Sequence, residues 1–345
     1  MRRAVKIMGA VALGVLAVFT IIAGWSFCET RRRHHDAPPP GQFFVVNGKQ
    51  LHIECTGQGS PAVVLESASS AAWSEWRLVQ PQLSQVTRVC SYDRPGHGWS
   101  PTSGDTRDAE GIVRDLHGLL DTAGVRRPFV LVGHSAGGLY VREYAYEYPN
   151  EIAGVALIES SSPRQLDELP GSRASYEEDK RDARGLELWK DRARVWSGWD
   201  RLVGNCSVSP SKTVQGEWVA QYAAMACRPG YVGTDEIELP YFETSSKESA
   251  RLKSFGSIPL LVVSQDITFD VDDESPRERA QQPVWEREQE EEKTLSPRSW
   301  RVIAKNSGHM VPRERPDVIV REVARLVTYL RGGDAPPFGT TSQGR

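Results

Sequence analysis

Short apolar runs alternate with stretches of helical pattern between about residue 43 and residue 330. Two strands around Asn47-Gly48 predict a hairpin, since this dipeptide favours a two-residue turn. Buried strands are predicted wherever a short apolar run is bounded by polar residues, at 62–65, 87–92, 129–132, 154–158, 258–264 and 300–304. Helices are predicted at 73–83, 108–122, 138–148 and 316–330, and those at 108–122 and 316–330 are amphipathic. Strands alternating with helices indicate an α/β fold with a mostly parallel sheet, whose ligands bind at the carboxyl ends of the strands.

The first 41 residues differ in pattern from the rest of the chain. An apolar run from Ile7 to Phe27 lies between basic residues on both sides, and a proline-rich stretch follows at 37–41. The run is about long enough to span a bilayer as a helix. We therefore expect residues 1–41 to form a membrane anchor or a signal segment with a proline-rich linker. An uncleaved anchor with the rest of the chain on the extracytoplasmic side is favoured over secretion, although basic residues on both sides of the run do not settle its orientation.

Three further segments stand apart by composition. Residues 163–257 lack a strand pattern, are rich in charge and carry irregularly spaced tryptophans, which are expected in an interior. Residues 332–345 are typical of a disordered tail, and the acidic run 286–292 is interpreted as solvated surface. The predicted core of the fold therefore comprises residues 42–162 and 258–331.

A strand-to-helix turn carries the clearest chemical signal in the chain. Residues 133–137 read Gly-His-Ser-Ala-Gly and fit the pattern G-x-S-x-G, with an apolar strand before them and a helical pattern after them. Small residues are needed at Gly133 and Gly137 because strand and helix backbones approach closely there. Such a turn exposes the serine hydroxyl above the sheet, so Ser135 is the candidate nucleophile.

A serine hydroxyl needs a base within hydrogen-bond reach and an acid that orients the base. His309 is the best candidate base, because it lies in the loop after the last predicted core strand and follows the serine in the expected chain order. Two carboxylates follow strand ends at the same edge of the sheet. Glu159 ends the strand at 154–158, and Asp266 follows the strand at 258–264. Both remain candidates for the acid on this reasoning.

The remaining site residues are predicted from topology. The oxyanion hole is expected to use the backbone N–H of Ala136 and a second N–H from the loop after residue 65, that of Ala68 or Ser67. Ser67, His97 and His134 are also candidates to line the substrate pocket, because each follows a strand end or adjoins the serine. His134 is expected to pack beneath the turn.

Three motifs together resemble the α/β-hydrolase family with a G-H-S-x-G-G nucleophile elbow. Besides the elbow at 133–138, residues 92–100 (Tyr-Asp-Arg-Pro-Gly-His-Gly-Trp-Ser) are similar to the family's D-x-R-G-x-G-x-S segment. Residues 307–309 (Ser-Gly-His), followed by Arg315-Pro316-Asp317, resemble its segment around the catalytic histidine. The resemblance covers about residues 45–330. It implies an eight-stranded, mostly parallel sheet flanked by helices, with residues 163–257 inserted as a cap after the sixth strand.

The chain departs from the family pattern at two positions. Glu66-Ser67 stands where most members carry His-Gly, which weakens the oxyanion assignment and places a carboxylate near the site. The spacing around Asp266 does not match the usual Gly-x-x-Asp turn. Because some relatives place the acid at the end of the sixth strand, the resemblance favours Glu159 over Asp266.

The resemblance also bears on the cysteines. The second and fourth strands of this family are neighbours in the sheet, which implies a disulfide between Cys55 and Cys90. Cys206 and Cys227 would then pair within the cap. These four cysteines form an even set, which suits an oxidising compartment.

Together these features predict a serine hydrolase that cleaves carboxylic esters through an acyl-enzyme. A small ester or a lipid-like molecule is the expected substrate, no metal or organic cofactor is needed, and the near-neutral charge gives no sign of nucleic-acid binding. Ser135 argues against dehalogenase and epoxide-hydrolase chemistry, which in this fold uses a carboxylate nucleophile. Amide or peptide cleavage, haloperoxidase-like activity, C–C bond hydrolysis, a lipid-acting enzyme and a non-catalytic binding protein remain alternatives.

Overall fold

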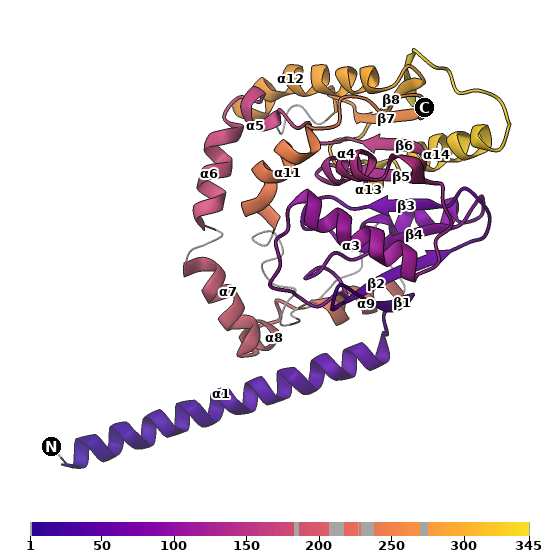
Figure 1. Ribbon diagram of the computed structural model, residues 1–345. Helices are drawn as coiled ribbons and strands as arrows, with labels where there is room; N and C mark the ends of the chain where they lie inside the picture. Colours follow the sequence, from indigo (N-terminus) through magenta and orange to yellow (C-terminus); the bar gives the residue numbers. More distant parts are fainter. Residues whose placement is uncertain are drawn as a thin grey trace. The chain divides into compact units, whose positions relative to one another are not determined.

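The computed structural model describes residues 2–182, 186–206, 217–226, 228, 238–269 and 275–344. The chain divides into two compact units (Figure 1). One unit joins Met1–Pro40 to Asp182–Glu236, and the other joins Gly41–Arg181 to Ile237–Arg345. The candidate site residues named above all belong to the second unit.

The second unit is built on a nine-stranded sheet in the order β1-β2-β4-β3-β5-β6-β7-β8-β9. The strands are β1 (Gln42–Val46), β2 (Lys49–Thr56), β3 (Val63–Glu66), β4 (Val89–Tyr92), β5 (Phe129–His134), β6 (Ile152–Ile158), β7 (Leu260–Gln265), β8 (Ser299–Ala304) and β9 (Thr341–Gly344). The hairpin β1–β2 and the pair β2–β4 are antiparallel, and the remaining pairs are parallel. The predicted α/β fold and hairpin are confirmed.

The C-terminal strand β9 corrects the sequence analysis in two respects. The sheet has nine strands instead of eight, and part of the tail 332–345 is ordered as a strand. Residues Thr341–Gly344 pair in parallel with residues Arg301–Ala304 of β8. The residues Thr-Ser-Gln-Gly show no apolar pattern. Backbone hydrogen bonds to β8 can hold such an edge strand, so its pairing left no signal in the sequence.

Helices cover both faces of the sheet and enclose two separate cores. On one face, α3 (Ala109–Thr122) and α4 (Gly137–Glu147) pack their apolar side chains against the sheet. On the other face, η1 (Trp73–Leu78), α2 (Gln80–Leu83) and α14 (Pro316–Leu330) do the same. The predicted helix at 108–122 begins where Asp108 accepts a hydrogen bond from the backbone N–H of Gly111, as an N-cap residue does.

Helix α12 (Pro276–Glu292) corrects the interpretation of the acidic run. Glu288, Gln289 and Glu292 are buried, although the run had been expected to be solvated surface. Buried carboxylates need partners, and Glu292 accepts a hydrogen bond from Arg142 Nη2 of α4 at 2.9 Å. Charge alone therefore misidentified one face of this helix.

The described parts of the stretch 163–257 consist of helices joined by turns and loops, and no strand occurs in those described parts. Its helices are α5 (Gln165–Glu168), α6 (Ser172–Asp182), α7 (Leu186–Trp196), α8 (Trp199–Leu202), α9 (Glu217–Met225), η3 (Leu239–Tyr241) and α11 (Phe242–Ser249). Its role as a cap remains a prediction. In the first unit, α8 and α9 pack against α1 (Arg2–Asp36).

A disulfide joins Cys55 of β2 to Cys90 of β4, and the two residues face each other in the antiparallel register. This pairing agrees with the one that the family resemblance implied. The other implied pair, Cys206 with Cys227, lies outside the described residues because Cys227 is not among them.

Candidate active site

The turn between β5 and α4 presents Ser135 in a strained conformation. Its φ of 52° lies in the left-handed region, which non-glycine residues rarely occupy. A side chain at Gly133 would meet the backbone of Gly137 at 2.6 Å, and one at Gly137 would meet the carbonyl oxygen of Glu66 at 2.6 Å. The two glycines therefore permit the close approach that the G-x-S-x-G pattern predicted.

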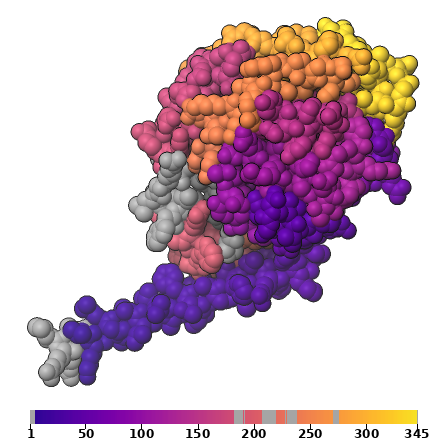
Figure 2. All heavy atoms as spheres, viewed as in Figure 1, coloured from indigo at the N-terminus to yellow at the C-terminus, as the bar shows by residue number. Residues whose placement is uncertain are grey.

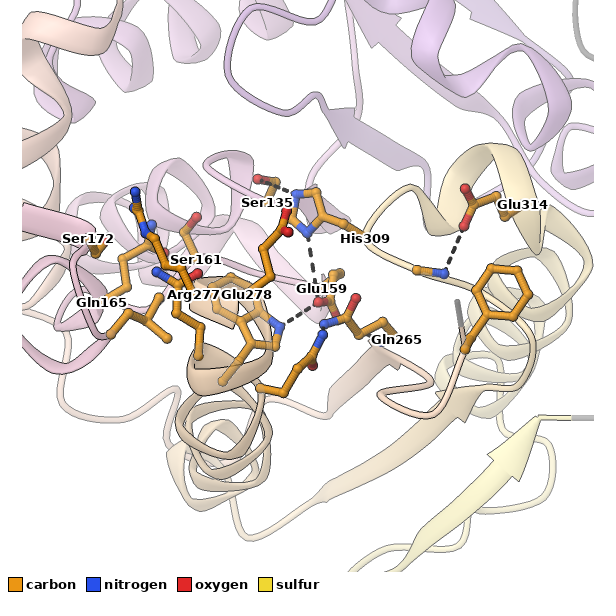
Figure 3. A pocket seen from close by; sticks show the side chains of 16 residues that line it. Ser135, Glu159, Ser161, Gln165, Ser172, Gln265, Arg277, Glu278, His309 and Glu314 are labelled. Carbon is orange, nitrogen blue, oxygen red and sulfur yellow. Dashed lines mark hydrogen bonds and ion pairs between the residues drawn. The ribbon is translucent and has the colours of Figure 1, made fainter. Parts of the chain in front are cut away.

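His309 and Glu159 lie beside Ser135 at the carboxyl ends of the parallel strands (Figure 3). The His309 Nε2 atom is 3.0 Å from Ser135 Oγ. The opposite ring nitrogen, Nδ1, is 3.7 Å from Glu159 Oε1, an ion-pair distance that exceeds hydrogen-bond length. Catalytic hydrogen bonds are often long in unliganded sites and shorten when substrate binds. The geometry thus places a base against the hydroxyl and a carboxylate behind the base.

The Glu159 carboxylate is buried and held from two sides. Its Oε2 accepts the backbone N–H of Gln265 at 2.6 Å, and its Oε1 accepts the indole N–H of Trp285 from α12. The backbone of Glu159 has a φ of 44°. Two donors and a strained backbone fix the carboxylate behind His309 and compensate for its burial.

Asp266, the alternative acid, has other partners. Its Oδ1 accepts from the backbone N–H and hydroxyl of Thr268, and its Oδ2 accepts the backbone N–H of Asn306 at 3.2 Å. Its own N–H donates to the carbonyl oxygen of Ser307 at 2.9 Å. The Thr268 and Asn306 hydrogen bonds outweigh the effect of burial and lower the pKa of Asp266. Asp266 therefore ties the end of β7 to the loop that carries His309.

His134 lies beneath the elbow and does not line the cavity at the serine, although it had been a candidate for the pocket. Its Nδ1 is 2.7 Å from Glu75 Oε1, and its Nε2 is 2.9 Å from the carbonyl oxygen of His309. Both partners are acceptors, so a doubly protonated ring satisfies both. Burial alone would lower the pKa of His134, but the Glu75 carboxylate raises it. The buried pair of His134 and Glu75 thus connects η1 to the backbone of His309.

One predicted oxyanion donor in the loop after β3 has another partner. The backbone N–H of Ala68 donates to Glu75 Oε2 at 2.9 Å, so this N–H is already committed to a carboxylate. Ser67, the other candidate in this loop, remains a prediction for the backbone donor. The Ala136 N–H stands at the start of α4, where backbone donors have no partner within the helix.

Buried charges hold this loop in place. Arg94 donates to the carbonyl oxygens of Ser67 and Ala68 at 2.9 and 2.6 Å, and it forms ion pairs with Glu66 and Glu238. Burial raises the pKa of Glu66 to about 7, although the Arg94 charge opposes this shift. The glutamate that replaces the family's histidine thus serves to bind Arg94.

Two other pocket candidates also lie away from the cavity at Ser135. The Ser67 hydroxyl donates to the Ala72 carbonyl oxygen and accepts the indole N–H of Trp76, both at 3.1 Å. His97 is buried 3.5 Å from Glu238 Oε1. Burial lowers the pKa of His97. A pocket role for Ser67 and His97 therefore stays a prediction, since neither residue is among the described lining residues of this cavity.

A cavity of about 540 Å³ opens at Ser135. Its lining includes all three residues of the Ser135–His309–Glu159 group, and Leu169, Phe269 and Trp285 supply apolar surface. Most other described lining residues are polar, among them Gln281 and Gln282. Others are labelled in Figure 3: Ser161, Gln165, Ser172, Gln265, Arg277 and Glu278. The volume is in the range of small-molecule sites.

The chain belongs to the alpha/beta hydrolase family, because the sequence pattern of that family matches residues 57–322. Solved structures agree on the fold. A ligand-free epoxide hydrolase, CorEH, superposes with a TM-score of 0.62 at 19% identity, covering 84% of this chain and 99% of that one. A thermophilic esterase from Thermogutta terrifontis gives a TM-score of 0.59 at 20% identity, covering 85% and 99%.

Curated relatives match over shorter segments. A 2-hydroxy-6-oxo-2,4-heptadienoate hydrolase of Pseudomonas putida is 30% identical over 34% of this chain and 44% of its own length. A 2-hydroxymuconate semialdehyde hydrolase of a Pseudomonas species is 27% identical over 42% of this chain and 54% of its own length. The matches span about half or less of these relatives, and they show a hydrolase family without showing the substrate.

Sequence reasoning missed two residues that hold the candidate acid. Trp285 and the backbone of Gln265 donate to Glu159. A single tryptophan in the charged segment 276–292 was the available signal for Trp285, since a large aromatic side chain there suggests an inward face. The backbone N–H of Gln265 leaves no trace in the sequence.

Proposed function

We propose that this protein is a serine hydrolase that cleaves carboxylic esters of small molecules through an acyl-enzyme. Ser135 Oγ attacks the ester carbonyl and His309 Nε2 takes its proton. Glu159 orients the imidazole and stabilises its charged form, and the Ala136 N–H binds the oxyanion. His309 then protonates the leaving alcohol and afterwards activates the water that releases the acid.

The observation that carries this proposal is the 3.0 Å contact between His309 Nε2 and Ser135 Oγ on a strained strand-to-helix turn. A hydroxyl becomes a useful nucleophile only when a base can remove its proton. The nearby carboxylate of Glu159, with its two fixed donors, supports the assignment of the acid. The commitments of Asp266 to Thr268 and Asn306 argue against it as the acid.

The nucleophile separates this chain from some proteins of the same fold. Epoxide hydrolases and haloalkane dehalogenases are among the solved structures with a similar fold. Their chemistry in this fold uses a carboxylate nucleophile, whereas the elbow here carries Ser135. A second candidate activity is hydrolysis of an oxo-dienoate or a semialdehyde, the substrates named for the two Pseudomonas relatives.

We also propose that α1 anchors the protein in a membrane and that the catalytic unit lies on the extracytoplasmic side. Residues Val5–Asp36 are helical, and their most apolar stretch has a mean hydropathy of 2.4 with none of it buried. The disulfide between Cys55 and Cys90 supports an oxidising compartment.

Hydrolysis of p-nitrophenyl esters from acetate to palmitate tests the catalytic proposal. We expect turnover by the full-length protein, and a loss of about 10³-fold or more with Ser135→Ala. Ser161→Ala is the matched control, since Ser161 also lines the cavity but lacks the contact with His309. Activity that survives in Ser135→Ala would refute the assignment. Inactivity on esters together with turnover of an oxo-dienoate would support the second candidate.

A further inference from the structure

The unit that contains α1 leaves the apolar part of this helix uncovered. The most apolar stretch of Val5–Asp36 has none of its residues buried, and it ends near Trp25 and Phe27, which are also exposed. Charged residues follow from Glu29 to Arg33. A helix inserted in a bilayer would therefore cross the membrane–water boundary at about residues 22–30.

Helix α8 packs against α1 at this level (Figure 2, pink spheres beside the indigo ones). A side chain at Gly198 would meet the carbonyl oxygen of Ile22 at 2.9 Å and Ser26 Cβ at 2.7 Å, so the two backbones come close. Arg201 donates to Ser26 Oγ at 3.2 Å and to Thr30 Oγ1 at 2.9 Å. These contacts fix α8 beside the end of the apolar run.

In the segment 196–203 the charged side chains are buried and the large apolar side chains are exposed, the reverse of the usual arrangement in a soluble protein. Its charged residues Asp200 and Arg201 are only 7% and 6% exposed. Its large apolar side chains are exposed instead, and together they form what we call the interfacial patch: Trp196 (66%), Trp199 (48%), Leu202 (52%) and Val203 (48%). Tryptophans in this stretch had been expected in an interior. Exposed apolar surface of this kind is rare in water unless something covers it.

We propose that the interfacial patch docks into the headgroup–acyl boundary of the bilayer that α1 spans. The patch belongs to the same compact unit as α1 and is joined to it at the level where the apolar run ends. Tryptophan side chains favour this boundary because they combine a large apolar ring with one polar N–H. The segment 196–203 is thereby held at the membrane surface as an interfacial element.

This inference rests on the proposed anchoring by α1 and not on the catalytic chemistry. It commits to lipid as the occupant because the patch lies on and beside α8, which packs against α1 where the apolar run of α1 ends. A second copy of this chain is the alternative occupant, and the experiment separates the two.

The test uses the full chain with Cys28→Ser, which removes the free exposed cysteine. One cysteine is introduced at a time as Leu202→Cys, Leu16→Cys or Val45→Cys and is labelled with the fluorophore NBD. Leu16 lies within the apolar part of α1, and Val45 is a matched exposed apolar residue on β1 of the other unit. The proteins are reconstituted in vesicles of phosphatidylcholine and phosphatidylglycerol, with nitroxide-bearing lipids or aqueous iodide as quenchers.

We expect the label at Leu202 to be quenched by a shallow lipid nitroxide at least about threefold more than the label at Val45, and to be shielded from iodide. The label at Leu16 should be quenched by a deep nitroxide. A Leu202 label as open to iodide as the one at Val45 overturns the proposal. A Leu202 label that is shielded from iodide but is not quenched by lipid nitroxide also overturns the proposal, because it would indicate that a protein covers the patch. An unquenched Leu16 label would overturn the anchoring and the proposal together, while ester hydrolysis could still stand.

Discussion

At the scale of single residues, the site depends on a carboxylate held by donors that lie far apart in the sequence. Glu159 accepts hydrogen bonds from Gln265 and Trp285, while Asp266 accepts hydrogen bonds from Thr268 and Asn306. Both carboxylates follow strand ends, yet one faces the imidazole and the other braces a loop. The difference lies in hydrogen-bond partners, which decide what a carboxylate can orient.

The two carboxylates give a direct comparison by substitution. We expect Glu159→Gln to lower kcat/KM for an ester substrate by about 10²–10⁴-fold, because an amide neither fixes the required tautomer of His309 nor stabilises its positive charge. Asp266→Asn should lower it by less than about tenfold, because the remaining amide oxygen still accepts either the two Thr268 hydrogen bonds or the Asn306 hydrogen bond. Steady-state kinetics with a single p-nitrophenyl ester measures both. A larger loss with Asp266→Asn would reverse the assignment of the acid.

At the scale of elements, α12 links the site to a buried ionisable group. Trp285 of this helix donates to Glu159, and Gln289 donates to the carbonyl oxygen of Ser160 at 2.7 Å. One turn further on, Glu292 is buried and bonds to Arg142. Burial raises the pKa of Glu292 to about 7, although Arg142 opposes the shift.

The raised pKa of Glu292 predicts a pH dependence of stability. In the unfolded chain this carboxyl group has the ordinary glutamate pKa of 4.5, whereas in the folded chain its pKa is about 7. Between these values the unfolded state binds fewer protons, so the free energy of unfolding falls as pH rises. Between pH 5 and pH 8, the free energy of unfolding of Glu292→Gln should therefore fall by about 1–3 kcal/mol less than that of the unmodified chain.

Denaturant titrations of the full-length protein across this pH range measure the effect. Glu291→Gln is the control, since it removes a neighbouring carboxylate of the same helix that is only partly buried. Equal slopes for Glu292→Gln and the unmodified chain would contradict the expected titration.

The elements also show what could be predicted from the sequence. The core strands and α3, α4 and α14 carry apolar patterns that reflect their burial, so their existence and order followed from periodicity. Strand β9 has no such pattern. The buried face of α12 includes glutamates, and the partner of Glu292 is Arg142, which lies far away in the sequence. Ser135 and His309 lie in local motifs and were predictable. The commitment of the Ala68 N–H to Glu75 depends on tertiary packing and was not.

At the scale of the whole molecule, the disulfide fastens the antiparallel edge of the sheet to its parallel part. It joins β2 to β4, closing a loop with a sequence separation of 35. Such a cross-link restricts the unfolded chain and thereby favours the folded one. It also fits a catalytic unit that matures outside the cytoplasm, beyond the proposed anchor α1.

Removal of this disulfide should destabilise the second unit. We expect Cys55→Ser combined with Cys90→Ser to lower the free energy of unfolding by about 2–4 kcal/mol. Cys28→Ser, which changes the free exposed cysteine, should have no measurable effect. Denaturant titration of the oxidised proteins provides the comparison, and equal stability of the two variants would show that the cross-link contributes little.

The proposed serine hydrolase activity depends on Ser135 being an activated nucleophile. Labelling of the full-length protein with a fluorophosphonate, followed by peptide mass spectrometry, measures this directly, because only an activated serine reacts rapidly with the probe. We predict one modified residue, Ser135, with no labelling in Ser135→Ala and much slower labelling in His309→Ala. An unreactive Ser135 in the intact protein, or undiminished labelling in Ser135→Ala, would contradict the proposed serine hydrolase and favour a ligand-binding member of the family.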